Sequence, residues 1–434
     1  MSSAATICPS LFCTTQQHKH PPLFICFGGL PSQKVDRFDF WSGTEDDFLK
    51  PMTIVVAPDS FKESLSADEA AKAIAAGFRE VFPEAKILRI PVADGGEGTV
   101  AAILSAVGGR EVPVSVMGPM GVAVAAFFGI SSDGRTAFLE MAAASGLELV
   151  AVSDRNPLKA TSYGTGELIR AALDAGVERL VIGIGGSATV DGGAGALQAL
   201  GASFLDAEDV MIDARGNAPL SRVARIDLSR VDGRLRRCSL EIACDVDNPL
   251  LGPAGAAAVF GPQKGAAPEM VPELEANLAV FSRALAEASG TDISAMPGAG
   301  AAGGIGGALV ACFGAKLCPG LPLLAELVGL EAAIQEADLV ITGEGRIDAQ
   351  TARGKTPAGV AEIAKRYGKP VIALAGCLGE GVEEVYRCGI DAVFSIQQGP
   401  CTVQEAYANA SINLQKTARN LAGLLKLSNG LLQI

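Results

Sequence analysis

The stretch Glu178–Gly195 combines glycines, hydroxyls and one carboxylate at a spacing suited to phosphate chemistry. Its sequence, ERLVIGIGGSATVDGGAG, is a run of branched apolar residues that leads into Gly185, Gly186 and Ser187 and then into Asp191. An apolar run bounded by glycine is typical of a buried strand that ends in a tight loop. Glycines let the backbone approach a ligand and direct its N–H groups at it, which suits a phosphate. Because a carboxylate in such a loop needs a metal or a substrate proton, the pattern indicates phosphoryl transfer, although a glycine-rich corner of an α/β fold would look the same.

A second glycine-dense stretch, Met296–Gly307, leads into an apolar helix. Its amides and the helix N-terminus, which carries about half a unit charge, could hold a phosphate, and the same glycines could form a hinge between domains. Gly298, Gly300 and Gly303 also match the dinucleotide-binding spacing GxGxxG, but the residues before them do not predict the strand that this fingerprint requires.

The segment Arg353–Thr356, RGKT, resembles the end of a P-loop, yet Ala349 stands where the first glycine would be and no strand is expected just before it. We therefore do not predict a Walker A loop here. Lys355 could still contact a phosphate, or it could be an ordinary solvated lysine.

Histidine is confined to the start of the chain. Both histidines, His18 and His20, precede Pro51, and so does the single tryptophan, Trp41. The chemistry of the remaining chain must therefore use carboxylates, lysines, arginines, hydroxyls, backbone amides and metal. This excludes a Ser-His-Asp hydrolase and a histidine-ligated metal centre there.

A recurring order of strand, polar loop and helix positions these residues. Apolar runs lead into the polar segments DGGEGT, DVDNPLLG and GEGRID, and SADE at Ser66–Glu69 matches a capping box at a helix start. Such alternation predicts an α/β chain with mainly parallel sheets, whose ligands gather at the carboxyl ends of the strands.

Composition limits the class of protein. The 434 residues carry a net charge of −13 and are 49% hydrophobic, without an apolar run of the roughly 18 to 20 residues that a membrane helix needs. We expect a soluble protein with neither a nucleic-acid nor an anionic-membrane surface, because both favour excess Lys and Arg. The ten cysteines form no CxxC pair, so a zinc site is not expected and a reduced compartment is the natural setting.

Residues 1–51 show no sustained periodicity and are interpreted as an extension. They could be an organellar targeting segment, although they contain few basic residues, or Met52 could be the true start. We therefore expect a cytoplasmic protein, or an organellar one if the extension is a transit segment.

Taken together, many segments resemble the glycerate kinase family, which includes the bacterial glycerate 2-kinases of glyoxylate and glucarate metabolism. In family order from about Met52 to Leu425, they are APDSFKESLSA, PVADGGEGT, EMAAASGLELV, TSYGTGELI, GIGGSATVDGGAGALQALGA, ACDVDNPLLG, FGPQKGA, PGAGAAGG, TGEGRID and GKTP. Two departures are the N-terminal extension and Val190, which stands where a polar residue often precedes the loop aspartate.

The resemblance implies two α/β domains with the active site in the cleft between them. One is flavodoxin- or Rossmann-like and discontinuous, and the other is inserted into it. The expected bounds are 52–115 with 293–425 for the first domain, 116–292 for the second, and 426–434 for a tail. The resemblance also implies ATP-dependent phosphorylation of D-glycerate to 2-phosphoglycerate with Mg²⁺.

Phosphoryl transfer depends mainly on positioning and charge neutralisation, so an aspartate can serve without a raised pKa. We expect Asp191 to orient the attacking hydroxyl or bind the metal beside it. The amides of Gly185, Gly186 and Ser187 would hold the transferred phosphate. Mg²⁺ prefers oxygen ligands, for which Asp245 and Glu344 are the candidates, with Asp348 in reserve.

Glycerate carries a carboxylate and two hydroxyls, so its pocket should offer a cation and several hydrogen-bonding groups. Lys62 is also a catalytic candidate. The candidates on the substrate side are Asp59, Ser60, Lys62, Asp94, Glu97 and Lys264, and those on the nucleotide side are Gly300, Gly303, Gly304 and Lys355. Each carboxylate could instead cap a helix, and each lysine could simply be solvated.

Three alternatives remain open at this stage. An NAD-dependent oxidoreductase acting on a small hydroxy acid would use the Gly298–Gly303 loop, and a non-enzymatic sugar-acid or nucleotide-binding protein would need fewer carboxylates. A kinase that forms 3-phosphoglycerate would use the same residues as one that forms 2-phosphoglycerate. The expected partner is D-glycerate, and the protein could form a homodimer.

Overall fold

The computed structural model describes residues 51–93, 95–96 and 98–431. The expected extension and two of the substrate-binding candidates, Asp94 and Glu97, lie outside the described residues. The chain divides between Lys50 and Pro51, and all described residues belong to the second unit.

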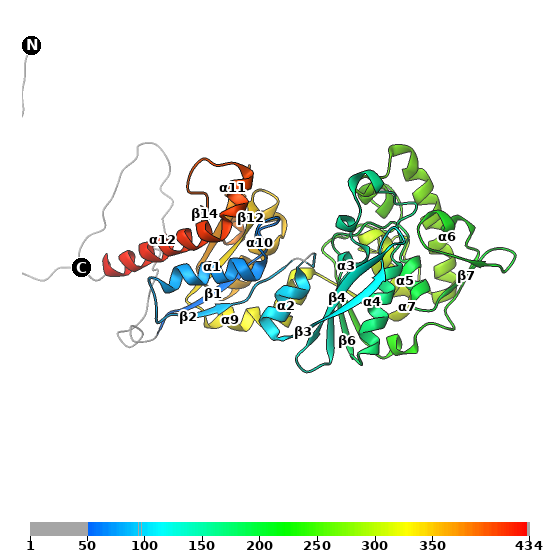
Figure 1. Cartoon of the computed structure of the whole chain (residues 1–434), viewed down its shortest axis with the longest axis horizontal. Coiled ribbons are helices and arrows are strands. Elements are labelled where there is room, and N and C mark those ends of the chain that lie inside the picture. Colours follow the sequence, from blue (N-terminus) through cyan, green and yellow to red (C-terminus); the bar gives the residue numbers. More distant parts are fainter. Residues whose placement is uncertain (1–50, 94, 97, 432–434) are drawn as a thin grey trace, which may run out of the picture. The chain divides into compact units, whose positions relative to one another are not determined.

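A five-stranded parallel sheet is formed by both ends of the described chain (Figure 1). The strand order is β14-β13-β12-β1-β2, in which β1 pairs with β12 from Ile54 opposite Leu339 to Pro58 opposite Gly343. The strands are β1 (Thr53–Pro58), β2 (Lys86–Arg89), β12 (Leu339–Ile347), β13 (Val371–Leu378) and β14 (Ala392–Ser395).

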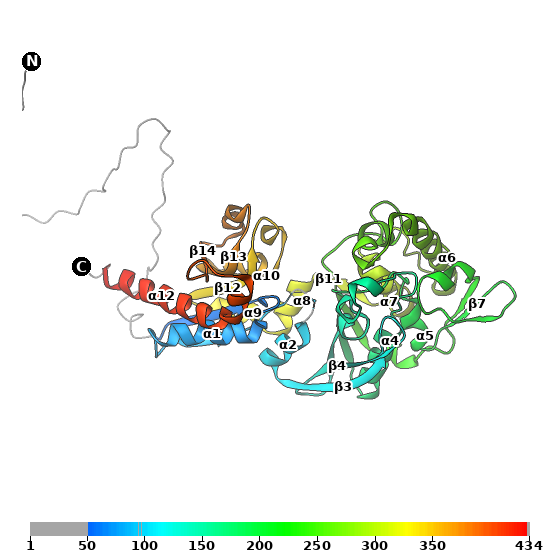
Figure 2. The same ribbon diagram turned by 45° about the horizontal axis from the view of Figure 1, so that its top comes forward.

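Helices cover both faces of this sheet because successive residues of β1 point to opposite sides. Ile54 and Val56 pack in one apolar cluster with α1 and α12, whereas Val55 and Ala57 pack in another with α9 and α10. Figures 1 and 2 show α1 and α12 side by side. The helices are α1 (Ala67–Arg79), α9 (Leu330–Glu336), α10 (Thr356–Arg366), α11 (Val403–Ala408) and α12 (Ala410–Leu431).

The expected capping box begins α1. The Ser66 hydroxyl accepts a hydrogen bond from the Glu69 amide, and the Glu69 carboxylate accepts one from the Ser66 amide. This prediction is confirmed.

A second sheet of six strands has the order β11-β10-β6-β5-β4-β3. The β5, β6, β10 and β11 strands run parallel, while β3–β4 and β4–β5 are antiparallel pairs. The strands are β3 (Gly109–Met117), β4 (Ala123–Ser131), β5 (Thr136–Glu140), β6 (Arg179–Gly183), β10 (Ser239–Ala243) and β11 (Lys316–Cys318).

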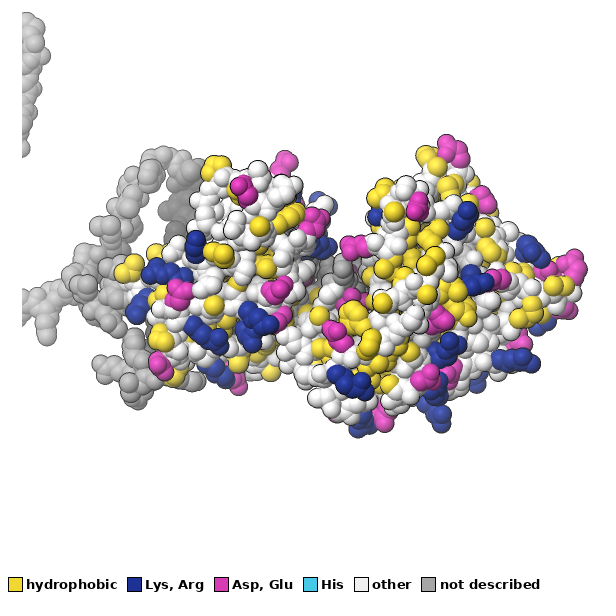
Figure 3. Space-filling model, viewed as in Figure 1, with side chains coloured by type: hydrophobic (Ala, Val, Ile, Leu, Met, Phe, Trp, Pro, Cys, Tyr) yellow, Lys and Arg dark blue, Asp and Glu magenta, His cyan; other side chains and the backbone are white. Residues whose placement is uncertain are grey.

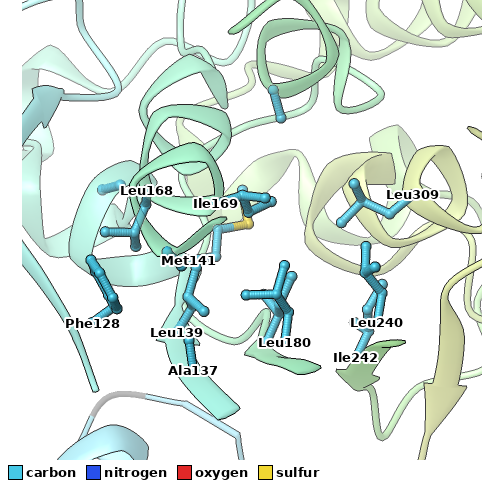
Figure 4. Close-up of a cluster of buried hydrophobic side chains, with 14 of the residues drawn as sticks. Phe128, Ala137, Leu139, Met141, Leu168, Ile169, Leu180, Leu240, Ile242 and Leu309 are labelled. Atoms are coloured by element: carbon cyan, nitrogen blue, oxygen red, sulfur yellow. The ribbon is translucent and has the colours of Figure 1, made fainter. Parts of the chain in front are cut away.

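The core of this second part lies on one face of β5, β6 and β10. Leu139, Leu180 and Ile242 pack there against Leu168 and Ile169 of α4 and Leu309 of α7 (Figure 4). The helices are α2 (Thr99–Val107), α3 (Met141–Ser145), α4 (Tyr163–Asp174), α5 (Ala194–Ala199), α6 (Val271–Ser289), α7 (Ile305–Phe313) and α8 (Gly320–Leu327).

Smaller elements complete the chain. A three-stranded antiparallel sheet consists of β7 (Ser203–Leu205), β8 (Met211–Ile212) and β9 (Arg225–Asp227), and Phe204 of β7 stacks with Phe281 of α6. The single-turn helices include Pro262–Lys264, Ala301–Gly304 and Thr351–Arg353.

The predicted α/β class with mainly parallel sheets is confirmed. The expected domain boundaries do not coincide with the edges of the sheets. The boundary at 115/116 falls inside β3, and β11, which lies after residue 293, joins the six-stranded sheet. The glycines around residue 300 suggested a boundary, but Ala301 and Ile305 pack in the core of that sheet.

Among the described residues, no helix is long and apolar enough to cross a membrane. On the face shown in Figure 3, Lys and Arg side chains are interspersed with Asp and Glu, without a continuous basic area.

Candidate active site

The loop after β6 has an exposed tip above a buried base. Gly185 and Gly186 are exposed, whereas residues 187–193 are buried. The base is tied to its neighbours by backbone hydrogen bonds, since the Ala188 amide donates to Ser145 (2.9 Å) and the Gly192 amide donates to Gly303 (2.8 Å). The predicted strand and glycine loop are therefore present, and only the two tip glycines are open to a ligand.

Asp191 lies in the buried base of this loop, with 0% of its surface exposed. Its Oδ2 accepts hydrogen bonds from the Ser162 amide (2.7 Å) and hydroxyl (2.9 Å), and its Oδ1 accepts one from the Gly193 amide (3.1 Å). Burial raises the pKa of the carboxyl, while these hydrogen bonds oppose the shift. In this conformation Asp191 has no surface with which to touch a substrate hydroxyl.

Lys264 is also buried, with 2% of its surface exposed, so it is not a solvated loop lysine. Its Nζ donates hydrogen bonds to the Ser187 hydroxyl (2.7 Å) and to the Thr189 carbonyl (2.7 Å). Burial lowers the pKa of Lys264 to about 7, and attraction to Asp191 opposes this shift. The structure therefore brings Asp191, Ser187 and Lys264 together.

The glycines at 300–304 allow close backbone packing beneath the same loop. A Cβ on Gly303 would lie 2.0 Å from the Thr189 carbonyl, and one on Gly304 would lie 2.6 Å from the Gly192 Cα. Gly300 is likewise buried, and its amide donates to the Asn248 carbonyl (2.9 Å). These contacts explain the glycines without a phosphate, and they place the stretch inside the packed body rather than at a hinge.

A second group of candidates lies at the carboxyl ends of β1 and β12, which are neighbouring strands. The Thr356 hydroxyl donates to Asp59 (2.7 Å), and the Thr351 hydroxyl donates to Glu344 (2.7 Å). The Lys355 ammonium lies 4.0 Å from the Glu344 carboxylate and directly precedes α10. Two carboxylates, one lysine and a helix N-terminus therefore meet at this edge of the sheet.

Glu344 has an unusual charge environment. Burial, together with repulsion from Asp59 and Asp348, raises the pKa of Glu344 to about 7, although Thr351 and Lys355 favour its ionised form. A bound cation would favour that ionised form, so the site fits Mg²⁺. Magnesium usually takes only one or two protein carboxylates in addition to phosphate and water. Among the described residues, no three His, Cys, Asp or Glu side chains form a group that could hold a metal ion.

Asp245 follows β10 of the six-stranded sheet, whereas Glu344 lies on β12 of the five-stranded sheet. Its Oδ1 accepts a hydrogen bond from the Gly320 amide (2.7 Å) at the start of α8. The structure thus shows Asp245 in the helix-capping position that was the alternative to metal binding.

Ser60 and Lys62 lie in the loop after β1. The Ser60 amide donates to the Asp59 carboxylate (2.6 Å), and Lys62 is exposed. Glu63 adopts a left-handed backbone conformation with φ of 65°, which is uncommon for a residue other than glycine. The loop therefore presents Lys62 to solvent.

Several residues with a clear structural role were not singled out from the sequence. Glu140 is buried at the end of β5 and accepts hydrogen bonds from the amides of Gly98 (3.2 Å) and Val100 (2.7 Å), so it holds the start of α2 beside the DGGEG segment. Ser162, Thr351 and Thr356 bind candidate carboxylates through their hydroxyls. Ser162 and Thr356 lie in segments that resemble family motifs, but hydroxyl residues are too common for the sequence to identify their partners.

Comparison of the sequence with known proteins identifies its family. Residues 54–426 match the glycerate kinase family. The chain is 55% identical to the glycerate kinase of Bacillus subtilis (strain 168), over 87% of this chain and 98% of the relative. It is 52% identical to the glycerate 2-kinase of Escherichia coli (strain K12), over 86% of this chain and 98% of the relative.

A solved crystal structure, from Salmonella typhimurium LT2 and named for glycerate kinase 2, superposes with a TM-score of 0.81 at 55% identity. It covers 88% of this chain and 100% of the solved chain. The match extends over both sheets, because the family residues run from β1 into α12. The chain belongs to the glycerate kinase family.

Proposed function

We propose that this protein catalyses the ATP-dependent phosphorylation of D-glycerate to 2-phosphoglycerate. The observation that carries the proposal is the 52% identity to the Escherichia coli glycerate 2-kinase over 98% of that protein. The regiochemistry rests on this relative, since the residues themselves do not select one hydroxyl.

The nucleotide phosphates are assigned to the edge of the five-stranded sheet formed by β1 and β12. The Lys355 ammonium and the N-terminus of α10 supply positive charge there. Glu344, with Asp59 beside it, supplies the oxygen ligands that suit Mg²⁺. Bound Mg²⁺ would neutralise charge on the phosphates.

Glycerate is assigned to Ser60 and Lys62, together with Asp94 and Glu97 from the sequence. The exposed Gly185–Gly186 tip is proposed to hold the transferred phosphate through its amides. In this structure the Gly185 amide donates to the Gly95 carbonyl (3.4 Å), a hydrogen bond that the phosphate would replace. Because Lys264 is bound to Ser187 and Thr189 inside the protein, we do not assign it to the glycerate carboxylate. Asp245 is kept as a second metal candidate. The location of the active site between the two domains is also part of the proposal.

The first test is product analysis. Purified protein incubated with ATP, Mg²⁺ and D-glycerate should yield 2-phosphoglycerate by phosphorus NMR. A 3-phosphoglycerate signal would keep the kinase and overturn the regiochemistry. If no phosphorylated product forms although the folded protein binds ATP, the substrate assignment is wrong.

The second test concerns Lys62. Because its exposed ammonium is assigned to the glycerate carboxylate, Lys62→Ala should raise the KM for glycerate by about 10- to 100-fold and leave the KM for ATP unchanged. Lys72→Ala is a matched control on α1, where the lysine pairs with Asp68 (2.5 Å). The reverse pattern of KM values would assign Lys62 to the nucleotide.

The cytoplasm is proposed as the location, with an organelle as the alternative. A homodimer is proposed as the assembly, and light scattering during size-exclusion chromatography measures it directly.

A further inference from the structure

The loop that follows β6 is held from below by side chains of distant segments. The Thr189 carbonyl accepts a hydrogen bond from Lys264 (2.7 Å), and the adjacent Val190 carbonyl accepts one from the Asn217 side chain (2.8 Å). Asn217 is buried and is itself held by Asn277 (2.9 Å) on α6. Two successive carbonyls are thus fixed by buried polar groups.

Asp191 continues this set of contacts towards α4 and α5. The Ser162 hydroxyl, just before α4, donates to Asp191 (2.9 Å) and accepts a hydrogen bond from the Ala196 amide (3.0 Å) in α5. Space beside the carboxylate is filled, since a Cβ on Gly195 would lie 3.0 Å from Asp191 Oδ2. Asp191 therefore joins the loop to the starts of two helices.

The buried charges of Asp191 and Lys264 also support each other across the loop, as their mutual attraction favours the charged lysine. A buried polar or charged group needs hydrogen-bonding partners, and both side chains have them here. Only Gly185 and Gly186 remain exposed above them.

We propose that Asp191 is a positioning residue, which through Ser162 and Gly193 fixes the buried base of the loop that carries the Gly185–Gly186 tip, and that it does not contact the glycerate hydroxyl. This inference deepens the proposed function and rests on it. It assigns Ser162, a residue outside the tip, to the same task.

Three variants test the inference: Ser162→Ala, Asp191→Asn and the double variant. Ser221→Ala and Asp292→Asn are matched controls, because both residues are exposed and bond only within their own turns. Each single variant should lower kcat/KM by about 10- to 100-fold, as expected from losing a hydrogen bond to a charged group. Because both changes affect the same hydrogen bond, between the Ser162 hydroxyl and the Asp191 carboxylate, the double variant should be little worse than Asp191→Asn.

Two further measurements separate positioning from proton transfer. A positioning carboxylate leaves the shape of the pH profile of kcat/KM unchanged in Asp191→Asn, whereas removal of a general base abolishes its acidic limb. Hydrogen exchange of peptides covering residues 186–193 should be faster in both single variants than in the controls, because the loop has lost its anchor.

The proposal is overturned if Asp191→Asn loses the acidic limb while Ser162→Ala keeps normal turnover and normal loop exchange. If Asp191→Asn does not fold, Ser162→Ala decides alone, and unchanged loop exchange would refute the anchoring. If the wild-type protein transfers no phosphate to glycerate, the proposed function fails; loop exchange in the variants still decides whether Asp191 positions the tip.

Discussion

Glu344 is the candidate residue with the clearest predicted dependence on pH. Its pKa rises from 4.5 to about 7 in the folded protein. The folded state therefore binds a proton more tightly than the unfolded state between these values, so the free energy of unfolding should fall as pH rises from about 4.5 to 7. At about 1.4 kcal/mol per pKa unit, the loss is at most about 3.5 kcal/mol.

The variant Glu344→Gln removes this titration. Its urea unfolding, compared with that of the wild type at several pH values, should show a relative gain in stability as pH rises through this window. Glu362→Gln, on the exposed side of α10, is the matched control, since its carboxylate is 74% exposed and pairs only with Arg366 four residues along the helix. A constant difference between Glu344→Gln and wild type across the window would show that Glu344 titrates normally.

The sequence identified the individual residues Asp191, Lys264 and Glu344 as candidates for the site but did not predict that they are buried. Asp191 is bound by Ser162, and Lys264 by Ser187 and Thr189, each pair being joined only when distant segments fold together. Asn217 carried no sequence signal at all, because its role depends on the position of one loop carbonyl. Residue type and spacing therefore revealed the loops, while tertiary packing determined which of their side chains are buried.

Among the elements, the contact between α1 and α12 depends on one glycine. A Cβ on Gly77 would lie 2.3 Å from the Gln415 carbonyl and 2.8 Å from the Ala418 Cβ. Alanine normally favours a helix over glycine by about 0.5 to 1 kcal/mol. Here the clash is with rigid backbone, so overpacking should outweigh that gain.

We expect Gly77→Ala to destabilise the protein by about 1 to 3 kcal/mol in thermal or urea unfolding. Gly423→Ala on α12 is the matched control, because the added Cβ would meet only the Arg419 side chain, 3.8 Å away. This control should be neutral or slightly stabilising. Equal effects of the two substitutions would mean that α1 and α12 do not pack as closely as described.

Strands with continuous apolar runs were the elements that the sequence predicted best. The apolar runs at β1, β6, β12 and β13 are mostly buried and pair with parallel neighbours, which gives a strong signal. The β3–β4 hairpin was not recognised, because β3 is a partly exposed edge strand that mixes charged, polar and apolar residues. The stretch around Gly300 was ambiguous, since glycines serve close packing as well as ligands and hinges.

For the whole molecule, the sequence motifs predicted the fold class and the family, but the strand order required the structure. The six-stranded sheet recruits β11 from well beyond the expected insertion, and pairing between strands so far apart in sequence leaves no local pattern. The same separation explains why the ends of the described chain share one sheet, with β1 in contact with β12 and α1 with α12.

This arrangement predicts where the functional chain begins. The family match starts at residue 54 and β1 starts at Thr53, so deletion of residues 1–50 should leave the melting temperature and the glycerate kinase activity unchanged. A deletion of residues 1–58 is the matched control. It removes β1, which pairs with both β2 and β12, so both pairings are lost and the protein should be destabilised. Differential scanning fluorimetry and the glycerate assay on both forms measure the effect. A large loss in the shorter deletion would show that residues 1–50 belong to the working enzyme. If neither deletion lowers stability or activity, the central place of β1 in the sheet is contradicted.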